Sequence, residues 1–137
     1  MEDCIFCKII DGQIPCSKVY EDSNVLCFLD NGPVNKGHLL VVPKQHAESI
    51  LDESDENLAH CMVAIKKVAG ALMKAMKAEG FNVINNAKPA AGQVIFHTHF
   101  HIIPRFANDG HRHWPQSKYS SAEEMDDIKL RIIKSIG

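Results

Sequence analysis

The feature that most constrains the fold is a change of hydrophobic period in the middle of the chain. From about Ser54, apolar side chains recur at three- and four-residue steps, which is the spacing of one face of an α-helix. These apolar residues are Leu58, Met62, Ile65, Ala69, Leu72 and Met76. Asp55 and Glu56 lie where acidic side chains favour a helix start, and Gly80 is the expected stop. The pattern predicts a long amphipathic helix between the two halves of the chain.

Strand signals lie on both sides of this helix. SKVYED, NVLCFLD and HLLVVP precede it, and FNVINN and QVIFHTHFHIIPR follow it. Pro43 closes HLLVVP, because proline cannot continue a ladder in the middle of a sheet. A short helix or turn is expected over CIFCKIIDG, and a last helix from Ser121, where Glu124 fits a capping box. This order predicts an α+β fold with an antiparallel sheet of about five strands, one long helix and one C-terminal helix.

Composition limits the class of protein. The chain has 137 residues and is 45% hydrophobic, which is enough for a single domain over residues 1–137 with a core that needs no disulfide or metal. Its net charge of −2 comes from interspersed acidic and basic residues, and without a basic run we expect no nucleic-acid partner. The apolar runs are too short to cross a membrane and the N-terminus opens acidic, so we expect no membrane partner and a cytoplasmic location.

Three histidines stand at alternate positions in HTHFHIIPR. On one strand, His97, His99 and His101 would share a face of the sheet. Residues two apart on a strand have Cα atoms roughly 6.5–7 Å apart, so the three imidazoles could not converge on one zinc ion without distortion. They could be structural histidines, but each would then need a partner of its own. We favour a catalytic interpretation in which His99 is a nucleophile or general base.

The pattern H-x-H-x-H-x-x with mostly apolar x resembles the signature of the histidine triad (HIT) superfamily of nucleotide hydrolases and transferases. CIFCKIIDGQIPCSKVYED, NVLCFLD, GHLLVVPKQH, FNVINN and AAGQVIFHTHFHIIPR are similar, in order, to the blocks of its bacterial branch. The resemblance implies a HIT-like fold, a homodimer and a small-molecule nucleotide substrate. Purine nucleoside phosphoramidates or dinucleoside polyphosphates would be cleaved at the α-phosphate through a covalent nucleotidyl-histidine. The alternative is a nucleotide-binding scaffold with little turnover.

The resemblance also implies roles for individual residues. His99 would attack the α-phosphorus, His101 would contact the phosphate oxygens, and His38 would support the imidazole cluster. The substrate-binding set consists of an apolar wall for the base, a carboxylate for the ribose, and two amides with one histidine for the phosphate or leaving group. In that order these are Ile5, Phe6, Ile9 and Phe28, then Asp30, then Asn86, Gln93 and His101. Val94 stands where several family members carry a serine that assists the leaving group.

Two of the five cysteines, Cys4 and Cys7, form a C-x-x-C pair. Because the number is odd, we expect reduced thiols, and the pair alone is compatible with redox chemistry, metal binding or chance. Zinc would need two more ligands, and His46 and His97 are available. A zinc branch of the HIT superfamily and the related galactose-1-phosphate uridylyltransferases use such a set. The resemblance therefore implies a structural Cys2His2 zinc site at Cys4, Cys7, His46 and His97, with unmetallated thiols as the alternative.

The remaining histidines carry weaker signals. His60 falls on the predicted long helix and is interpreted as a solvated or partly buried residue. His111 and His113 lie in DGHRHWPQ, whose composition is that of a loop. We expect a flexible segment from His111 to Trp114, near the active site or a dimer interface.

Overall fold

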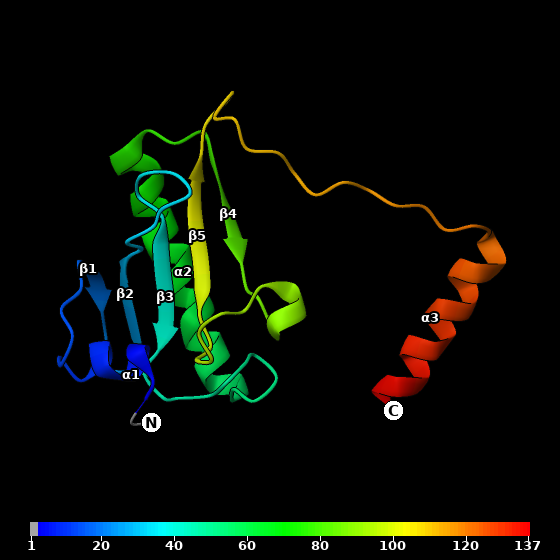
Figure 1. Cartoon of the computed structure of the whole chain (residues 1–137), viewed down its shortest axis with the longest axis horizontal. Coiled ribbons are helices and arrows are strands. Elements are labelled where there is room, and N and C mark those ends of the chain that lie inside the picture. The colour runs from blue at the N-terminus through cyan, green and yellow to red at the C-terminus, as the bar shows by residue number, and fades with distance from the viewer. Residues whose placement is uncertain (1–2) are drawn as a thin grey trace.

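The structure is a computed structural model that describes residues 3–137 (Figure 1). Its elements follow in the order α1 Ile5–Ile10, β1 Lys18–Glu21, β2 Val25–Leu29, β3 Leu39–Pro43, α2 Asp55–Met76, β4 Gly80–Ile84, the 3-10 turn η1 Pro89–Ala91, β5 Phe100–Arg105 and α3 Ala122–Ile136. The five strands form one antiparallel sheet in the order β1-β2-β3-β5-β4. The predicted α+β class and five-stranded sheet are confirmed.

The long helix α2 begins where the sequence predicts and ends earlier. Ser54 is its N-cap, and the Ser54 hydroxyl accepts a hydrogen bond from the Asn57 N–H. Lys77 ends the helix in the left-handed conformation at φ 52°, so the prediction that Gly80 is the stop was wrong. The prediction for Met62 was also wrong: its side chain is 53% exposed, because the neighbouring Cys61 takes the buried position.

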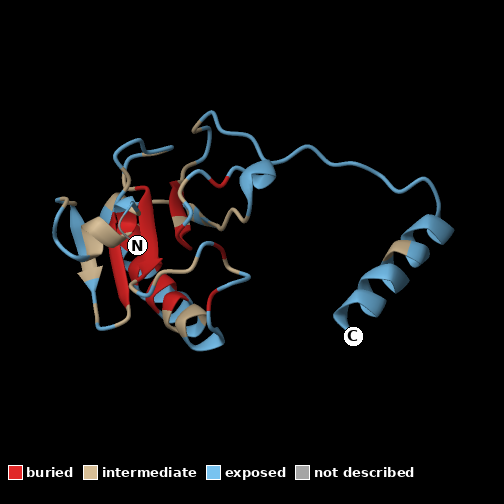
Figure 2. Ribbon diagram, turned by 60° about the horizontal axis from the view of Figure 1, so that its bottom comes forward, coloured by how far each residue is buried: buried red, intermediate tan, exposed pale blue. Residues whose placement is uncertain are grey.

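Successive residues of the central strands are buried (Figure 2). Because successive side chains point to opposite sides of a sheet, both faces of these strands are covered. Side chains on one face pack against α2; those from the strands are Val25, Cys27, Leu39, Val41, Phe100 and Ile102. On the other face, Leu26, Phe28, Leu40 and Val42 pack with Phe6 of α1. Full burial of each large apolar side chain stabilises the fold by about 1.5–3 kcal/mol. The histidine-bearing face is thus covered only in part, by the short helix α1.

The last strand is shorter than HTHFHIIPR suggests. β5 begins at Phe100, so His97 and His99 lie before it, and the prediction of one strand through all three histidines was wrong. The ladder with β3 extends only from Val41 opposite Phe100 to Leu39 opposite Ile102. Before that point the chain bonds to the segment after β3 instead: the Thr98 N–H and hydroxyl both donate to the Ala47 carbonyl. These contacts replace a regular ladder, and the buried His97 ring bonds to the carbonyl of Pro43, the last residue of β3.

The chain leaves the domain after β5 (Figure 1). Residues 110–120 are exposed and without helix or strand, and they lead to α3, which stands apart from the sheet. Ser121 is the predicted N-cap of α3 and accepts from the Glu124 N–H, while the Glu124 carboxylate accepts from the Ser120 N–H. Among residues 3–137, no helix is both long and apolar enough to cross a membrane.

Candidate active site and metal site

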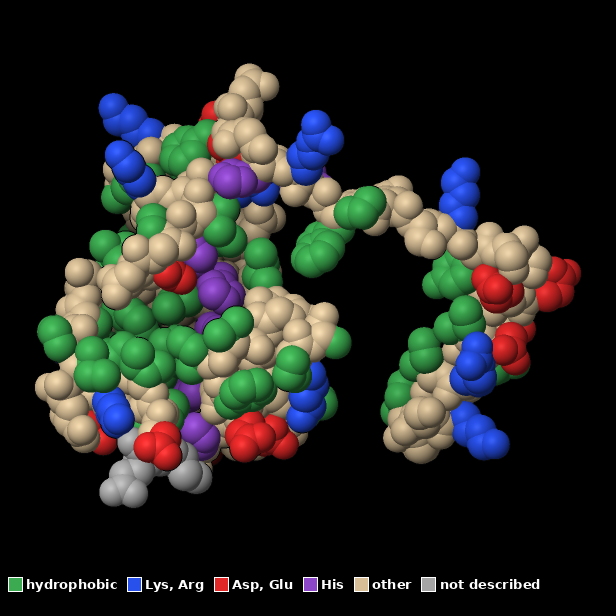
Figure 3. All heavy atoms as spheres, in the orientation of Figure 1, with side chains coloured by type: hydrophobic (Ala, Val, Ile, Leu, Met, Phe, Trp, Pro, Cys, Tyr) green, Lys and Arg blue, Asp and Glu red, His purple; other side chains and the backbone are tan. Residues whose placement is uncertain are grey.

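Histidine side chains form a row along the face of the sheet opposite α2 (Figure 3). His101 lies on β5 between two neighbours, opposite Leu40 of β3 and Ile84 of β4. His38 directly precedes β3, and its Nε2 lies 2.9 Å from Nδ1 of His101. The rings of His99 and His101 are 5.1 Å apart between centroids. The structure therefore brings together His38, His99 and His101, the three predicted catalytic histidines.

Hydrogen-bond partners determine which ring nitrogen of His99 carries the proton. Its Nδ1 lies 2.7 Å from the His97 carbonyl oxygen. A carbonyl oxygen only accepts, so Nδ1 must carry a proton and donate. In the neutral ring this leaves Nε2 of His99 with a free lone pair. Phe6 packs edge-on against the same ring at 5.1 Å between centroids and restricts its orientation.

A second chain of hydrogen bonds orients His101. The Val34 N–H donates to Nδ1 of His38 at 3.1 Å, so in neutral His38 the proton resides on Nε2. His38 Nε2 then donates to Nδ1 of His101. Neutral His101 consequently carries its proton on Nε2. The site presents a free lone pair on His99 beside an N–H donor on His101, which is the combination that a nucleophile and an oxyanion contact require.

Burial keeps these imidazoles neutral near pH 7. It lowers the pKa of His99 and of His38 below the ordinary value. Burial, with the neighbouring His99 and His38 as smaller causes, lowers the pKa of His101 to about 4. Asp30, whose carboxylate lies 3.7 Å from Nε2 of His38, acts in the opposite direction on all three rings. A neutral His99 is the form that can attack an electrophile.

Acidification is expected to weaken folding through these histidines. The pKa of folded His101 is about 4, below its ordinary 6.5, so the unfolded chain takes up the proton first as pH falls. The stability present above about pH 6.5 is therefore lost between about pH 6.5 and about pH 4, and the loss levels off below that range. Urea unfolding at several pH values measures it. His101→Gln should show a shallower decline, and an equal decline in both proteins would contradict the assignment.

The four predicted metal ligands converge at one end of the histidine row. Their ligand atoms all lie within 4.8 Å of one another. Cys4 Sγ is 3.4 Å and Cys7 Sγ 3.6 Å from Nδ1 of His97, Cys7 Sγ is 3.5 Å from Nδ1 of His46, and the two Nδ1 atoms are 3.1 Å apart. Tetrahedral zinc with ordinary bond lengths places S and N ligands about 3.5 Å apart and two N ligands about 3.3 Å apart. The donor set fits a closed Cys2His2 site.

His97 is held in the orientation that such a site needs. Its Nε2 lies 2.8 Å from the Pro43 carbonyl oxygen and must donate, which leaves Nδ1 directed at the two sulfurs. The ring is fully buried. Asp30, His38 and His101 also lie close enough to be considered for a metal. However, the 2.9 Å between His38 and His101 is a hydrogen-bond length, and Nε2 of His38 is a donor there.

Of the four residues predicted to wall the base pocket, three lie in one cluster and one lies apart. Phe6 and Phe28 are buried and pack edge-on at 5.7 Å between centroids, and Ile9 packs against the same cluster. Ile5 instead is 44% exposed and lines a separate cavity with His46, Val94 and Phe96, beside the four metal ligands. Asp30 lies beside His38, and one of its carboxylate oxygens accepts a hydrogen bond from the Gly32 N–H.

The two predicted amides differ in their surroundings. Gln93 is buried, accepts from the Lys88 N–H and donates to the Ile95 carbonyl, so its side chain holds the loop that contains η1. Asn86 is half-buried beside Gly92. Its neighbour Asn85, which the sequence did not single out, donates to the His99 carbonyl at 2.9 Å.

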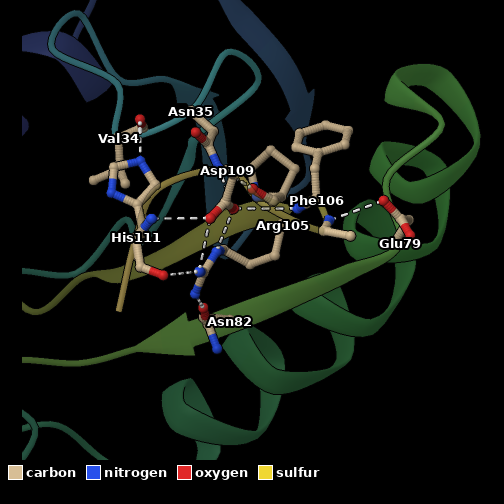
Figure 4. Close-up of polar contacts among 10 residues, drawn as sticks. Val34, Asn35, Glu79, Asn82, Arg105, Phe106, Asp109 and His111 are labelled. Atoms are coloured by element: carbon tan, nitrogen blue, oxygen red, sulfur yellow. Dashed lines mark hydrogen bonds and ion pairs between the residues drawn. The ribbon is translucent and has the colours of Figure 1, made fainter. Parts of the chain in front are cut away.

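A polar clasp at the end of β5 supports the site and was missed by sequence reasoning (Figure 4). We define the clasp as Val34, Asn35, Arg105, Asp109 and His111. Asp109 accepts from Nε of Arg105 at 2.8 Å and from the Asn35 amide at 3.0 Å, and the Arg105 guanidinium holds the pKa of Asp109 well below its usual range. His111 donates to the Val34 carbonyl. The clasp thereby fixes the loop whose Val34 N–H orients His38.

The only sequence signal for the clasp is local. Arg105 and Asp109 are four residues apart in RFANDG, whose Asn108 adopts a positive φ of 61°. That spacing indicates a tight turn with an ion pair across it. The bonds to Val34 and Asn35 connect positions about seventy residues away in the chain, and no local pattern predicts them.

Residues 11–108 match the profile of the HIT domain, and the chain belongs to the HIT family. It is 47% identical over 102 residues to adenosine 5'-monophosphoramidase hnt1 of Schizosaccharomyces pombe, covering 74% of each protein. The crystal structure of SMU.412c from Streptococcus mutans is similar with a TM-score of 0.95 and 44% identity, over 100% of this chain and 87% of that one. A zinc-bound HIT protein from Mycobacterium smegmatis is 31% identical with a TM-score of 0.77, over 99% of each chain.

Proposed function

We propose that the protein is a nucleotidyl hydrolase or transferase that cleaves purine nucleoside phosphoramidates or dinucleoside polyphosphates at the α-phosphate. The observation that carries this proposal is the free lone pair on Nε2 of His99 beside the N–H of His101. A protein that only binds nucleotides does not need an unprotonated imidazole nitrogen in this position. Membership of the HIT family and the likeness to a phosphoramidase support the assignment.

The reaction proceeds in two displacements. Nε2 of His99 gives its lone pair to the α-phosphorus, the bond to the leaving group breaks, and the departing nitrogen or oxygen takes the bonding pair and a proton from water. The resulting nucleotidyl-imidazolium keeps its Nδ1–H on the His97 carbonyl. In the second displacement, the oxygen of a water molecule attacks phosphorus and the water releases a proton. The bond between phosphorus and Nε2 of His99 breaks, and Nε2 recovers its lone pair. His101 Nε2–H donates to the phosphate oxygens in both steps, and His38 holds His101 in position.

Substrate binding is assigned to the residues around this centre. Phe6, Ile9 and Phe28 offer an apolar, aromatic surface for the base, which gives burial with little discrimination between bases. Asp30 offers its carboxylate to the ribose hydroxyls. Asn86 and Gln93 remain proposed contacts for phosphate or leaving group. Gln93 must first give up a backbone hydrogen bond to serve in this way.

We propose that Cys4, Cys7, His46 and His97 hold a structural zinc ion. The fit of their spacing to a tetrahedral S2N2 set and the likeness to a zinc-bound HIT protein support this. When bound, zinc would supply a cross-link between α1 and the segment that carries His99. No step of the reaction uses it. We further propose, from the family resemblance, that the protein acts in the cytoplasm as a homodimer.

A substrate panel tests the function. Adenosine phosphoramidate and diadenosine polyphosphates are each incubated with the protein, and acid-quenched samples are examined by mass spectrometry for an adenylyl group on His99. The expected result is AMP release together with a transient adduct on that residue. If AMP binds by calorimetry but no substrate is turned over and no adduct forms, the protein is the scaffold of the alternative interpretation.

A further inference from the structure

The carboxylate of Asp109 lies at the centre of the clasp, and both of its oxygens are hydrogen-bonded (Figure 4). The side chain is only 7% exposed, and the Arg105 guanidinium keeps its pKa well below the usual range, so it is ionised near pH 7. Oδ2 accepts from Nε of Arg105, from the Asn35 amide and from the Phe106 N–H. Oδ1 accepts from Nη2 of Arg105 and from the His111 N–H. A charged acceptor with this many donors holds all of them in fixed positions.

These bonds determine where the loop between β2 and β3 lies. Val34 and the three residues before it are exposed, so packing does little to hold the tip of this loop. The Asn35 amide ties the loop to the end of β5, because it donates to the Pro104 carbonyl at 2.8 Å as well as to Asp109. His111, whose N–H is held by Asp109, donates through Nε2 to the Val34 carbonyl at 3.2 Å. The backbone of Val34 is therefore positioned from outside its own loop.

The Val34 N–H in turn determines proton positions in the active site. It donates at 3.1 Å to Nδ1 of His38, which is only 4% exposed. Because Nδ1 accepts, Nε2 of His38 carries the proton and donates to His101, and His101 keeps its own proton on Nε2. The Asp30 carboxylate also favours a proton on Nε2 of His38, but at 3.7 Å it lies beyond hydrogen-bond length. The contact from Val34 thus fixes both tautomers.

Without this donor, the opposite arrangement of protons becomes available. Once the loop moves away, Nδ1 of His38 has lost its donor, and it can carry the proton and donate to water that enters. Nε2 of His38 would then accept from Nδ1 of His101, and Nε2 of His101 would be left with a lone pair. That lone pair would repel the phosphate oxygens that the N–H otherwise binds. One backbone donor therefore decides whether His101 stabilises the developing charge or opposes it.

We propose that Asp109 is a positioning residue that fixes the tautomers of His38 and His101. It acts through His111 and the Val34 backbone and does not touch the substrate. Its effect on turnover rests on the proposed function, because only a reaction at phosphorus needs the N–H of His101. The proton positions themselves do not depend on turnover, so they can be measured whatever the activity of the protein.

Nitrogen NMR of the full chain, prepared with isotopically labelled histidine, tests this role directly. A ring nitrogen that carries a proton and one that does not resonate in separate regions, so spectra at about pH 8, where these rings are neutral, report each tautomer. His38→Gln and His101→Gln assign the resonances. Wild type should carry its protons on Nε2 of both rings, and Asp109→Ala should move protons to Nδ1 of both. Wild-type tautomers in folded Asp109→Ala would overturn the proposal.

A matched control is Asp22→Ala. The Asp22 carboxylate likewise accepts several hydrogen bonds, from the Tyr20 hydroxyl and from the N–H groups of Asn24 and Val25, each at 2.8 Å. These bonds hold the turn between β1 and β2, and none of them leads to the active-site histidines. Asp22→Ala should therefore lower stability and leave both tautomers as in wild type. A tautomer change in this control as large as that in Asp109→Ala would show a general loss of structure and would overturn the proposal.

A second variant decides the matter where Asp109→Ala fails to fold. His111 is exposed, so His111→Ala should fold, and it removes only the ring donor to the Val34 carbonyl. It should move protons to Nδ1 of His38 and His101, as predicted for Asp109→Ala. Unchanged tautomers in His111→Ala would overturn the proposal.

Kinetics show whether the tautomers matter to the reaction. With adenosine phosphoramidate, Asp109→Ala should lower kcat at least about 10-fold and leave KM within about 3-fold, because the lost N–H acts chiefly on charge that develops in the transition state. Asp22→Ala should keep kcat within about 3-fold. A tautomer change without a change in kcat would overturn the positioning role. If wild type itself has no turnover, the proposed function is wrong, and the NMR result alone decides whether Asp109 fixes the two tautomers.

Discussion

Replacing His99 with alanine is expected to lower turnover of adenosine phosphoramidate at least about 10⁴-fold, because the first displacement loses its nucleophile. The geometry makes this the largest single effect on activity. Among His38, His99 and His101, only His99 has a ring nitrogen with a free lone pair, and its other nitrogen is committed to the His97 carbonyl. Steady-state kinetics measure the loss, and the adenylyl adduct should disappear from the mass spectrum of the quenched protein.

A matched control is available on α2. His60 lies on α2, which packs on the face of the sheet opposite the histidine row, and its ring is 3.7 Å from Glu56. His60→Ala should therefore retain turnover within about 2-fold. Thermal unfolding of both variants checks that they are folded. If folded His99→Ala turns substrate over as wild type does, the proposed covalent mechanism is wrong, whatever the protein binds.

Removing the metal site is expected to have the largest effect on stability. Cys4→Ser withdraws one of two thiolates from the cluster that joins α1 to His97. Binding to a structural zinc site contributes directly to folding free energy, so the melting temperature should fall by more than about 10 °C. Elemental analysis should find one zinc per chain in wild type and almost none in the variant. Turnover should decline together with the folded fraction.

Cys16→Ser is the control, since Cys16 is half-buried and lies outside the cluster. It should keep its zinc and melt within about 3 °C of wild type. A chelator distinguishes the structural role from a catalytic one. If chelation abolished turnover while the protein stayed fully folded, zinc would have to act in the reaction, and the structural assignment would be wrong. If purified wild type contained no zinc, and adding zinc left its melting temperature unchanged, the alternative of unmetallated thiols would be supported.

Elements with a strong local pattern could be predicted from the sequence. The alternation in NVLCFLD corresponds to β2, the apolar run HLLVVP that Pro43 closes corresponds to β3, and the period change at Ser54 corresponds to the start of α2. Element ends were harder, because they depend on contacts made elsewhere. β5 starts at Phe100 because neither β3 nor β4 offers a partner for the preceding residues. Lys77 ends α2 although nothing in its residue type requires a left-handed conformation.

The candidate site could be predicted as a set of residue types, but its division of labour could not. Sequence spacing brings His97, His99 and His101 into one short segment. Their different functions arise from partners at remote positions: Pro43 turns His97 toward the sulfurs, and Val34 orients His38 toward His101. Asn85 and the clasp could not be predicted, because an amide or an ion pair has no sequence signature until its partner is known.

The sequence by itself determined the period of each main element, the α+β class and the chemical groups that the protein can use, because these depend on residues that are neighbours in the chain. Only the tertiary structure decided which ring nitrogen of His99 is free, that Cys4 and Cys7 meet His46 and His97, and that no side chain of α3 is buried within residues 3–137. Each of these depends on contacts between residues far apart in sequence. The proton positions and packing surfaces that govern reactivity and assembly are set by those contacts.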